Sequence, residues 1–162
     1  MQIYISGPLQ GSHDLAAARS FYDELGRIVS RAGHVAYIPH HNTDPLAARS
    51  LSSEDVFQRD IEALNESDAV IAHIGMPSTG VGAEIALAAA SRRPILGIKR
   101  PHEPSSRFTE GLISGAGGAV FVFTTTIDLA PLVNAWLADA NFARELPVPL
   151  ALRSRFGHAV AV

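Results

Sequence analysis

The chain has 162 residues, of which 47% are hydrophobic and 18% charged, the composition of a globular domain with one core. A formal net charge of −3 and the lack of a lysine- or arginine-rich run argue against a nucleic acid polymer as partner, but leave a single nucleotide open as a ligand. The sequence contains no cysteine, which excludes disulfides, thiolate metal ligands and a cysteine nucleophile.

The first predicted strand, Gln2–Ser6, follows Met1 without a basic leader. No apolar run along the chain reaches membrane-spanning length, so we expect a cytoplasmic protein with no membrane partner. Residues 15–32 carry apolar side chains at helical spacing and stop at Gly33, which predicts a helix with a glycine C-cap. A second strand over residues 34–38 ends at Pro39.

Residues 40–51 are polar and contain Asn42, Asp44 and Pro45, a pattern typical of a functional loop. Ser52 then caps a predicted helix whose apolar face carries Val56, Ile61 and Leu64. The remaining elements are a third strand at 69–74, a helix after residue 78, a fourth strand at 94–98, a polar loop at 100–114 with a short helix as an alternative at its end, a fifth strand at 119–124 and a helix at 128–140.

Strands that alternate with helices predict an α/β fold, a doubly wound (Rossmann/flavodoxin-like) five-stranded parallel sheet flanked by helices. Ligands of such sheets bind outside the carboxyl ends of the strands, so the polar loops after the strands are expected on one functional edge. We expect one domain over residues 1–146, and a C-terminal tail or docked arm over residues 147–162, where prolines interrupt the pattern.

Residues 78–84, Ser-Thr-Gly-Val-Gly-Ala-Glu, are the most informative segment. They join a buried strand to a helix through a glycine-bearing turn, and unpaired N–H groups at a helix start attract anions. A carboxylate, Glu84, lies one turn inside that helix. It is either an ordinary acid stabilised by the helix dipole or a group that acts on the ligand; the surrounding small residues leave room for the second role.

The other candidates also have structural alternatives. Asp60 is either a solvated helix carboxylate or a reactive one, and Tyr4 either fills the core or reaches the sheet edge. Ser78 caps the helix, a role compatible with binding phosphate. His40 and His41 are adjacent and should point apart, so we expect no metal site and a loop histidine that contacts solvent or substrate.

Five motifs, taken in order, resemble the nucleoside 2-deoxyribosyltransferase superfamily, and within it most closely the 2′-deoxynucleoside 5′-monophosphate N-glycosidases. The resemblance covers residues 2 to about 125. The motifs are Tyr4-Ile5-Ser6-Gly7-Pro8, Arg59-Asp60-Ile61, Ser67-Asp68-Ala69-Val70-Ile71-Ala72, Gly80-Val81-Gly82-Ala83-Glu84-Ile85 and Arg93-Pro94-Ile95-Leu96.

By this resemblance Glu84 is the nucleophile or stabilising carboxylate at the anomeric carbon, Asp60 assists departure of the base, and Tyr4 lies beside the sugar. The resemblance implies no metal and no cofactor, and a homodimer with shared active sites. The expected substrate-binding residues are Gly7, Leu9, Gln10, His40, Ser78, Gly80 and Gly82.

Ser78 is the position that favours a nucleotide over a nucleoside. The transferases tend to carry an aspartate there, which contacts a free 5′-hydroxyl, whereas the monophosphate hydrolases carry a serine. An aspartate would repel a phosphate dianion, and a hydroxyl beside backbone N–H groups would bind it. Gln10 departs from the family pattern, because the hydrolases often carry an arginine in this loop; Arg100 and Arg107 are alternative cations. The serine that the partner subunit contributes in the family has three candidates, Ser105, Ser106 and Thr109.

The sequence therefore predicts an enzyme, an N-glycosidase that hydrolyses a (2′-deoxy)nucleoside 5′-monophosphate to free base and (deoxy)ribose 5-phosphate. Tyr4, where some ribonucleotide-preferring relatives carry phenylalanine, favours the 2′-deoxy sugar. The alternative is a nucleoside 2′-deoxyribosyltransferase. An alternative of another class is a non-catalytic nucleotide-binding module, against which the combination of Asp60 and Glu84 argues.

Overall fold

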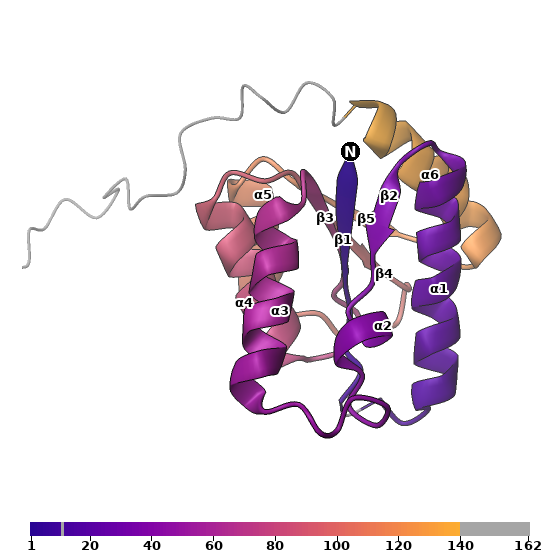
Figure 1. The fold of residues 1–162 in the computed structure, drawn as a ribbon. Coiled ribbons are helices and arrows are strands. Elements are labelled where there is room, and N and C mark those ends of the chain that lie inside the picture. The colour runs from indigo at the N-terminus through magenta and orange to yellow at the C-terminus, as the bar shows by residue number, and fades with distance from the viewer. Residues whose placement is uncertain (11, 140–162) are drawn as a thin grey trace, which may run out of the picture.

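The computed structural model describes residues 1–10 and 12–139 (Figure 1). The predicted tail over residues 147–162, and its boundary with the domain, lie outside the described residues. The elements, in chain order, are β1 (Gln2–Ser6), α1 (Leu15–Arg31), β2 (Val35–Tyr37), α2 (His40–Thr43), α3 (Ser53–Glu66), β3 (Ala69–His73), α4 (Thr79–Ala90), β4 (Ile95–Lys99), α5 (Arg107–Gly115), β5 (Ala119–Val122) and α6 (Thr126–Asp139).

The five strands form one parallel sheet in the order β2-β1-β3-β4-β5, which confirms the predicted fold class. The chain leaves β1 in one direction to reach β2 and returns past β1 to β3, so the strand order reverses between β1 and β3. In open α/β sheets, ligands bind at the carboxyl ends of the strands beside such a reversal.

Helices cover both faces of the sheet, with α1 and α6 on one side and α3, α4 and α5 on the other (Figure 1). Successive residues of a strand point to opposite faces, and β1 follows this rule. Ile3 and Ile5 belong to the core under α1 and α6, while Tyr4 belongs to the core under α3 and α4. Within the described residues, no helix combines the length and the hydropathy that a membrane crossing requires.

Helices α3 and α4 begin at the serine caps that the sequence predicts. Ser52 accepts the N–H of Asp55, and the Asp55 carboxylate accepts the N–H of Ser52, which completes a capping box at α3. Ser78 caps α4 by accepting the N–H of Val81 at 3.4 Å. This cap fixes the first turn of α4 directly after β3, so the segment 78–84 lies at the carboxyl edge of the sheet.

The segment 40–51 is more ordered than the predicted loop. Its first residues form the short helix α2, which begins after Pro39. The buried carboxylate of Asp44 pairs with Arg19 of α1 and accepts the N–H groups of Leu46 and Ala47. Asp44, one of the residues that predicted a loop, thus anchors the segment to α1. In the second polar loop, the nine-residue helix α5 confirms the short helix that the sequence allowed at its end.

Candidate active site

Two residues of β1 hold the carboxylate of Glu84, one oxygen each. The Tyr4 hydroxyl donates to Oε1 of Glu84 at 2.8 Å, and the Ser6 hydroxyl donates to Oε2 at 2.5 Å. Tyr4 and Ser6 are two positions apart on one strand, so both side chains project from the same face of the sheet, toward α4. The strand end and the helix start thus meet at Glu84, beside the strand-order reversal.

The groups around Glu84 have opposite effects on the pKa of its carboxyl. Burial raises the pKa of the Glu84 carboxyl above its ordinary value, the hydrogen bonds from Ser6 and Tyr4 lower it, and the nearby charge of Asp60 raises it. Burial and the charge of Glu84 also raise the pKa of Tyr4, which therefore stays protonated and remains a donor. A half-buried carboxylate with two hydroxyl donors is suited to stabilise or attack a cationic carbon.

Asp60, the second carboxylate, is held from the side of β2 and α2. The Thr43 hydroxyl lies 3.0 and 3.1 Å from its two oxygens, and the Tyr37 hydroxyl lies 3.4 Å from Oδ1. Burial is the main cause that raises the pKa of Asp60. Tyr37 also stacks on Tyr4, with ring centroids 5.4 Å apart, so an aromatic pair connects the two carboxylate sites.

A cavity of about 160 Å³ lies between α3 and α4, and both predicted catalytic carboxylates line it. Its other lining residues are mostly apolar: Phe57, Ile61, Leu64, Gly80, Ala83 and Leu87. Asp60 and Glu84, which are distant in the sequence, thus face the same space.

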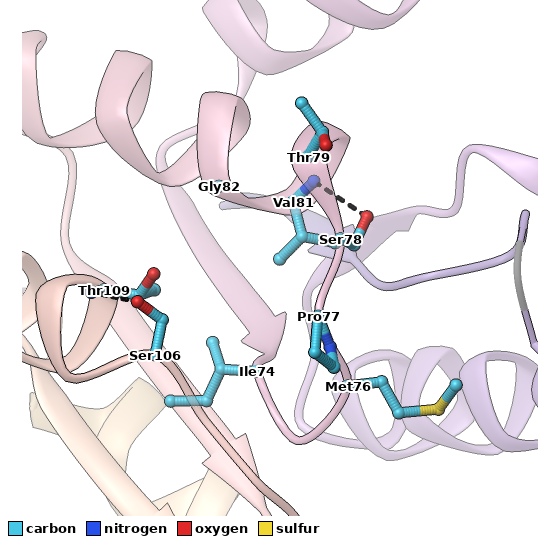
Figure 2. Close-up of a pocket in the computed structure, with 9 residues that line it drawn as sticks. All are labelled: Ile74, Met76, Pro77, Ser78, Thr79, Val81, Gly82, Ser106 and Thr109. Atoms are coloured by element: carbon cyan, nitrogen blue, oxygen red, sulfur yellow. Dashed lines mark hydrogen bonds between the residues drawn. The ribbon is translucent and has the colours of Figure 1, made fainter.

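A second cavity, of about 320 Å³, lies between the starts of α4 and α5 (Figure 2). Ser78, the N-cap of α4, faces it from one side, and Ser106, the N-cap of α5, and Thr109 face it from the other. The N-terminal residues of two helices thus line this space, and helix N-termini carry partial positive charge, which favours an anion nearby. Arg100 and Arg107, the alternative cations, do not line it.

Gly80 and Gly82 leave open space on the first turns of α4. A Cβ at Gly80 would come no closer than 3.9 Å to another group, the Ser78 hydroxyl, and a Cβ at Gly82 would meet nothing within 4 Å. Neither residue has the positive φ that requires glycine. Protein packing thus does not explain these glycines, whereas a ligand close to the helix backbone would.

The other predicted binding residues differ in their surroundings. Gly7 lies against Tyr22, where a Cβ would approach the ring to 2.2 Å, so packing accounts for this glycine. Leu9 packs on the core under α1 and α6, and Gln10 is exposed. His40 lines neither of the two cavities. Its side chain is 6% exposed and faces Asp23 of α1.

His40 and His41 do not point apart, which corrects the prediction from their adjacency. Both Nε2 atoms lie near Oδ1 of Asp23, at 3.0 and 2.8 Å, because the turn of α2 brings the two rings edge to face. The three possible ligand atoms lie within 4.8 Å of one another. Metal-bound histidines usually donate their other ring N–H, and Nδ1 of His40 is buried with no partner among the described residues. The Asp23 carboxylate is thus within hydrogen-bond distance of both imidazoles.

Three contacts of the carboxylates were not predicted from the sequence: those of Ser6, Tyr37 and Thr43. The signal for Ser6 is its place two residues after Tyr4 on a strand, which puts both side chains on one face. The contacts of Tyr37 and Thr43 depend on how α2 and β2 pack beside α3, and no sequence pattern shows this.

The chain has relatives of known family. The profile of the nucleoside 2-deoxyribosyltransferase family matches residues 3–142. A protein of Methanosarcina barkeri with the provisional name 2′-deoxynucleoside 5′-phosphate N-hydrolase 1 is 32% identical over 114 residues, which cover 68% of this chain and 69% of that protein. The human 5-hydroxymethyl-dUMP N-hydrolase is 31% identical over 118 residues, covering 70% of this chain and 64% of the human one.

Solved structures share the fold. The Clostridium botulinum CMP N-glycosidase has a TM-score of 0.63 at 14% identity, with 84% of this chain and 99% of that chain covered. A 2-deoxyribosyltransferase of Bacillus psychrosaccharolyticus has a TM-score of 0.58 at 18% identity, with 80% and 90% covered. Together with the profile match over most of its length, the motifs and the fold show that this chain belongs to the nucleoside 2-deoxyribosyltransferase family.

Proposed function

We propose that the protein hydrolyses the N-glycosidic bond of a 2′-deoxynucleoside 5′-monophosphate to free base and deoxyribose 5-phosphate. The observation that carries this proposal is the pair of carboxylates, Asp60 and Glu84, on the wall of one cavity beside a helix start suited to an anion. The names of the relatives, nucleoside 5′-phosphate N-hydrolases, support the same activity.

Glu84 supplies the nucleophile in this mechanism. Cleavage of the N-glycosidic bond gives the anomeric carbon oxocarbenium character, and a carboxylate oxygen of Glu84 stabilises this cation or bonds to the carbon as an ester. The electron pair of the C–N bond leaves with the base. The donors Tyr4 and Ser6 keep the carboxylate oriented while it reacts.

Asp60 supplies the proton. Burial raises the pKa of this carboxyl, which favours its protonated form, and in that form it can protonate the departing base. The resulting carboxylate then takes a proton from water, and the hydroxide oxygen bonds to the anomeric carbon as the Glu84 ester bond breaks. This step returns Asp60 to its acid form and Glu84 to its carboxylate.

The cavity between α4 and α5 receives the 5′-phosphate in this proposal. Ser78 and Glu84 are six residues apart, which corresponds to about 9 Å along the helix axis. Gly80 lines the cavity of Glu84 and Gly82 lines the phosphate cavity, so their missing side chains leave room for one sugar phosphate at the start of α4. Ser106 and Thr109 of the same chain lie opposite Ser78 and offer further donors.

The second candidate is a 2′-deoxyribosyltransferase, because the ester on Glu84 can also be resolved by a second base. Ser78 favours hydrolysis of a phosphorylated substrate, since it places a neutral hydroxyl where a charged aspartate would repel the phosphate. A non-catalytic nucleotide-binding module gains nothing from two carboxylates near that phosphate, so it is the weaker alternative.

A homodimer with shared active sites is part of the proposal. Phe57 of α3 is 59% exposed and Leu87 of α4 is 41% exposed, and both border the cavity of Asp60 and Glu84. Large apolar side chains at the rim of a polar site are typical of a surface that a second subunit covers. A second copy on this face would also exclude water from the carboxylates.

The test is a panel of nucleosides and their 5′-monophosphates, incubated with the protein with and without an acceptor base. Free base is measured by chromatography. Base release from monophosphates without acceptor is the expected result. Product that forms only with an acceptor would identify a transferase, and no turnover of any compound would identify a binding module.

A further inference from the structure

We propose that Ser6 is a positioning residue of this site: its hydroxyl orients the carboxylate of Glu84 and stabilises its negative charge. This inference rests on the proposed function only in taking Glu84 as the reacting group. The clamp itself, a hydroxyl on each oxygen of the carboxylate, is a feature of the structure.

Ser6 is fully buried at the end of β1, and its backbone pairs with Ala72 of β3. Among the described residues, the polar partner of its hydroxyl is Oε2 of Glu84, at 2.5 Å. A hydroxyl has one proton to donate, and here the carboxylate oxygen is the acceptor. The hydroxyl therefore has a role at Glu84 that the sheet does not require of this position.

The geometry explains why one donor is insufficient. Tyr4 alone holds Oε1 and leaves the carboxylate free to rotate about its last bond. Ser6 fixes the second oxygen from the same strand, which sets the plane of the carboxylate against the cavity. Without Ser6, Oε2 would lose its hydroxyl donor, and a half-buried carboxylate that loses a donor favours its protonated, non-nucleophilic form.

A merely structural role and a positioning role predict different results. A serine that only fills space at the strand end contributes to stability and leaves the titration of Glu84 in place. A serine that stabilises the charge of Glu84 lowers the pKa of that carboxyl, so its removal moves the acidic limb of the kcat–pH profile to higher pH.

The experiment compares Ser6→Ala and Ser6→Cys with Ser67→Ala as the matched control. Ser67 is also buried, but its hydroxyl donates to the backbone carbonyl of Ala63 and is not part of the site. The Glu84 carboxyl is followed by ¹³C NMR titration of protein labelled at the glutamate carboxyl carbons, and its signal is identified by its loss in Glu84→Gln. Activity is measured as base release from a 2′-deoxynucleoside 5′-monophosphate across pH.

We expect Ser6→Ala to raise the midpoint of the Glu84 titration by about one pH unit. The acidic limb of the kcat–pH profile should move to higher pH by the same amount. At pH values below that limb, kcat should therefore be roughly tenfold lower than in the wild type. KM should change little. Ser6→Cys, whose thiol is a weak donor, should give a smaller shift in the same direction. Ser67→Ala should leave both curves in place.

Unchanged Glu84 titration in folded Ser6→Ala and Ser6→Cys protein would overturn the role of Ser6. That result is distinguishable from failure of the proposed function. If Glu84→Gln retained base release, the catalytic role of Glu84 would be wrong, whatever the NMR titration of the Ser6 variants showed.

Discussion

Tyr4 and Glu84 are 80 positions apart in the chain and are joined by a 2.8 Å hydrogen bond from the phenol to Oε1. This contact links the first strand to the first turns of α4, at the place where the strand order of the sheet reverses. It unites two of the separate motifs by which the sequence resembles its family. The bond also makes Tyr4 the clearest test of how Glu84 is held.

Tyr4→Phe removes this donor and keeps the ring that stacks on Tyr37. A hydrogen bond to a charged group contributes about 1.5–3 kcal/mol, so kcat should fall about ten- to a hundredfold. Steady-state kinetics on a monophosphate measure this. Tyr22→Phe, which alters a buried tyrosine on the opposite face of the sheet, is the control and should retain kcat much better. Equal activity of Tyr4→Phe and the wild type would remove Tyr4 from the site.

Gly82→Ala separates ligand binding from folding. Alanine in a helix is more favourable than glycine by about 0.5–1 kcal/mol, and the added Cβ meets no protein atom, so Tm should rise slightly. The methyl group would enter the cavity assigned to the phosphate, so kcat/KM should fall at least tenfold. Gly111→Ala in α5, where a Cβ also has open space, should give the same gain in Tm without the loss of activity. Full activity of Gly82→Ala would show that the ligand does not approach this turn.

Ser78→Asp tests the assignment of the phosphate. Aspartate caps helices as well as serine does, so α4 should form normally. Its charge would oppose a phosphate dianion, so the ratio of kcat/KM for monophosphate over nucleoside should drop at least tenfold. The ratio is measured directly when the monophosphate and the nucleoside compete for the enzyme in one reaction. An unchanged preference for the monophosphate would place the phosphate elsewhere.

Asp60→Asn tests the pH dependence of stability. Burial raises the pKa of Asp60 in the folded protein above its value in the unfolded chain, so folding favours the protonated form of this carboxyl. The stabilising contribution of this group is present below the ordinary carboxyl pKa, about 4, and is lost as pH rises through the raised folded value. Asparagine does not titrate, so the variant should exceed the wild-type Tm by a few °C at pH 7 and match it near pH 4. Thermal unfolding across pH measures the difference, and a difference that stays constant with pH would contradict the raised pKa.

Much of the fold was predictable because its signals are local. The alternation of Ile3, Tyr4 and Ile5 between the two cores, the capping box at Ser52 and the cap at Ser78 are all properties of neighbouring residues. The carboxyl edge of a parallel sheet then brings distant segments together, which is why Tyr4 and Glu84 could be expected near each other.

The rest depends on contacts between elements. The polarity of residues 40–51 predicted a loop, but Arg19, from another helix, binds Asp44 and helps to tie the segment down. His40 and His41 converge because Asp23 of α1 faces both of them. Thr43 reaches Asp60 through the packing of α2 on α3. None of these partners can be identified from sequence spacing.

Glu84→Gln is the most direct test of the central claim, that Glu84 is the group that reacts at the anomeric carbon. The amide keeps the shape of the side chain and loses its charge and nucleophilicity, so base release from 2′-deoxynucleoside 5′-monophosphates should fall by about a thousandfold or more with no loss of Tm. Glu62→Gln, an exposed change on α3, is the matched control and should retain activity. Base release by folded Glu84→Gln protein within tenfold of the wild-type rate would contradict the account.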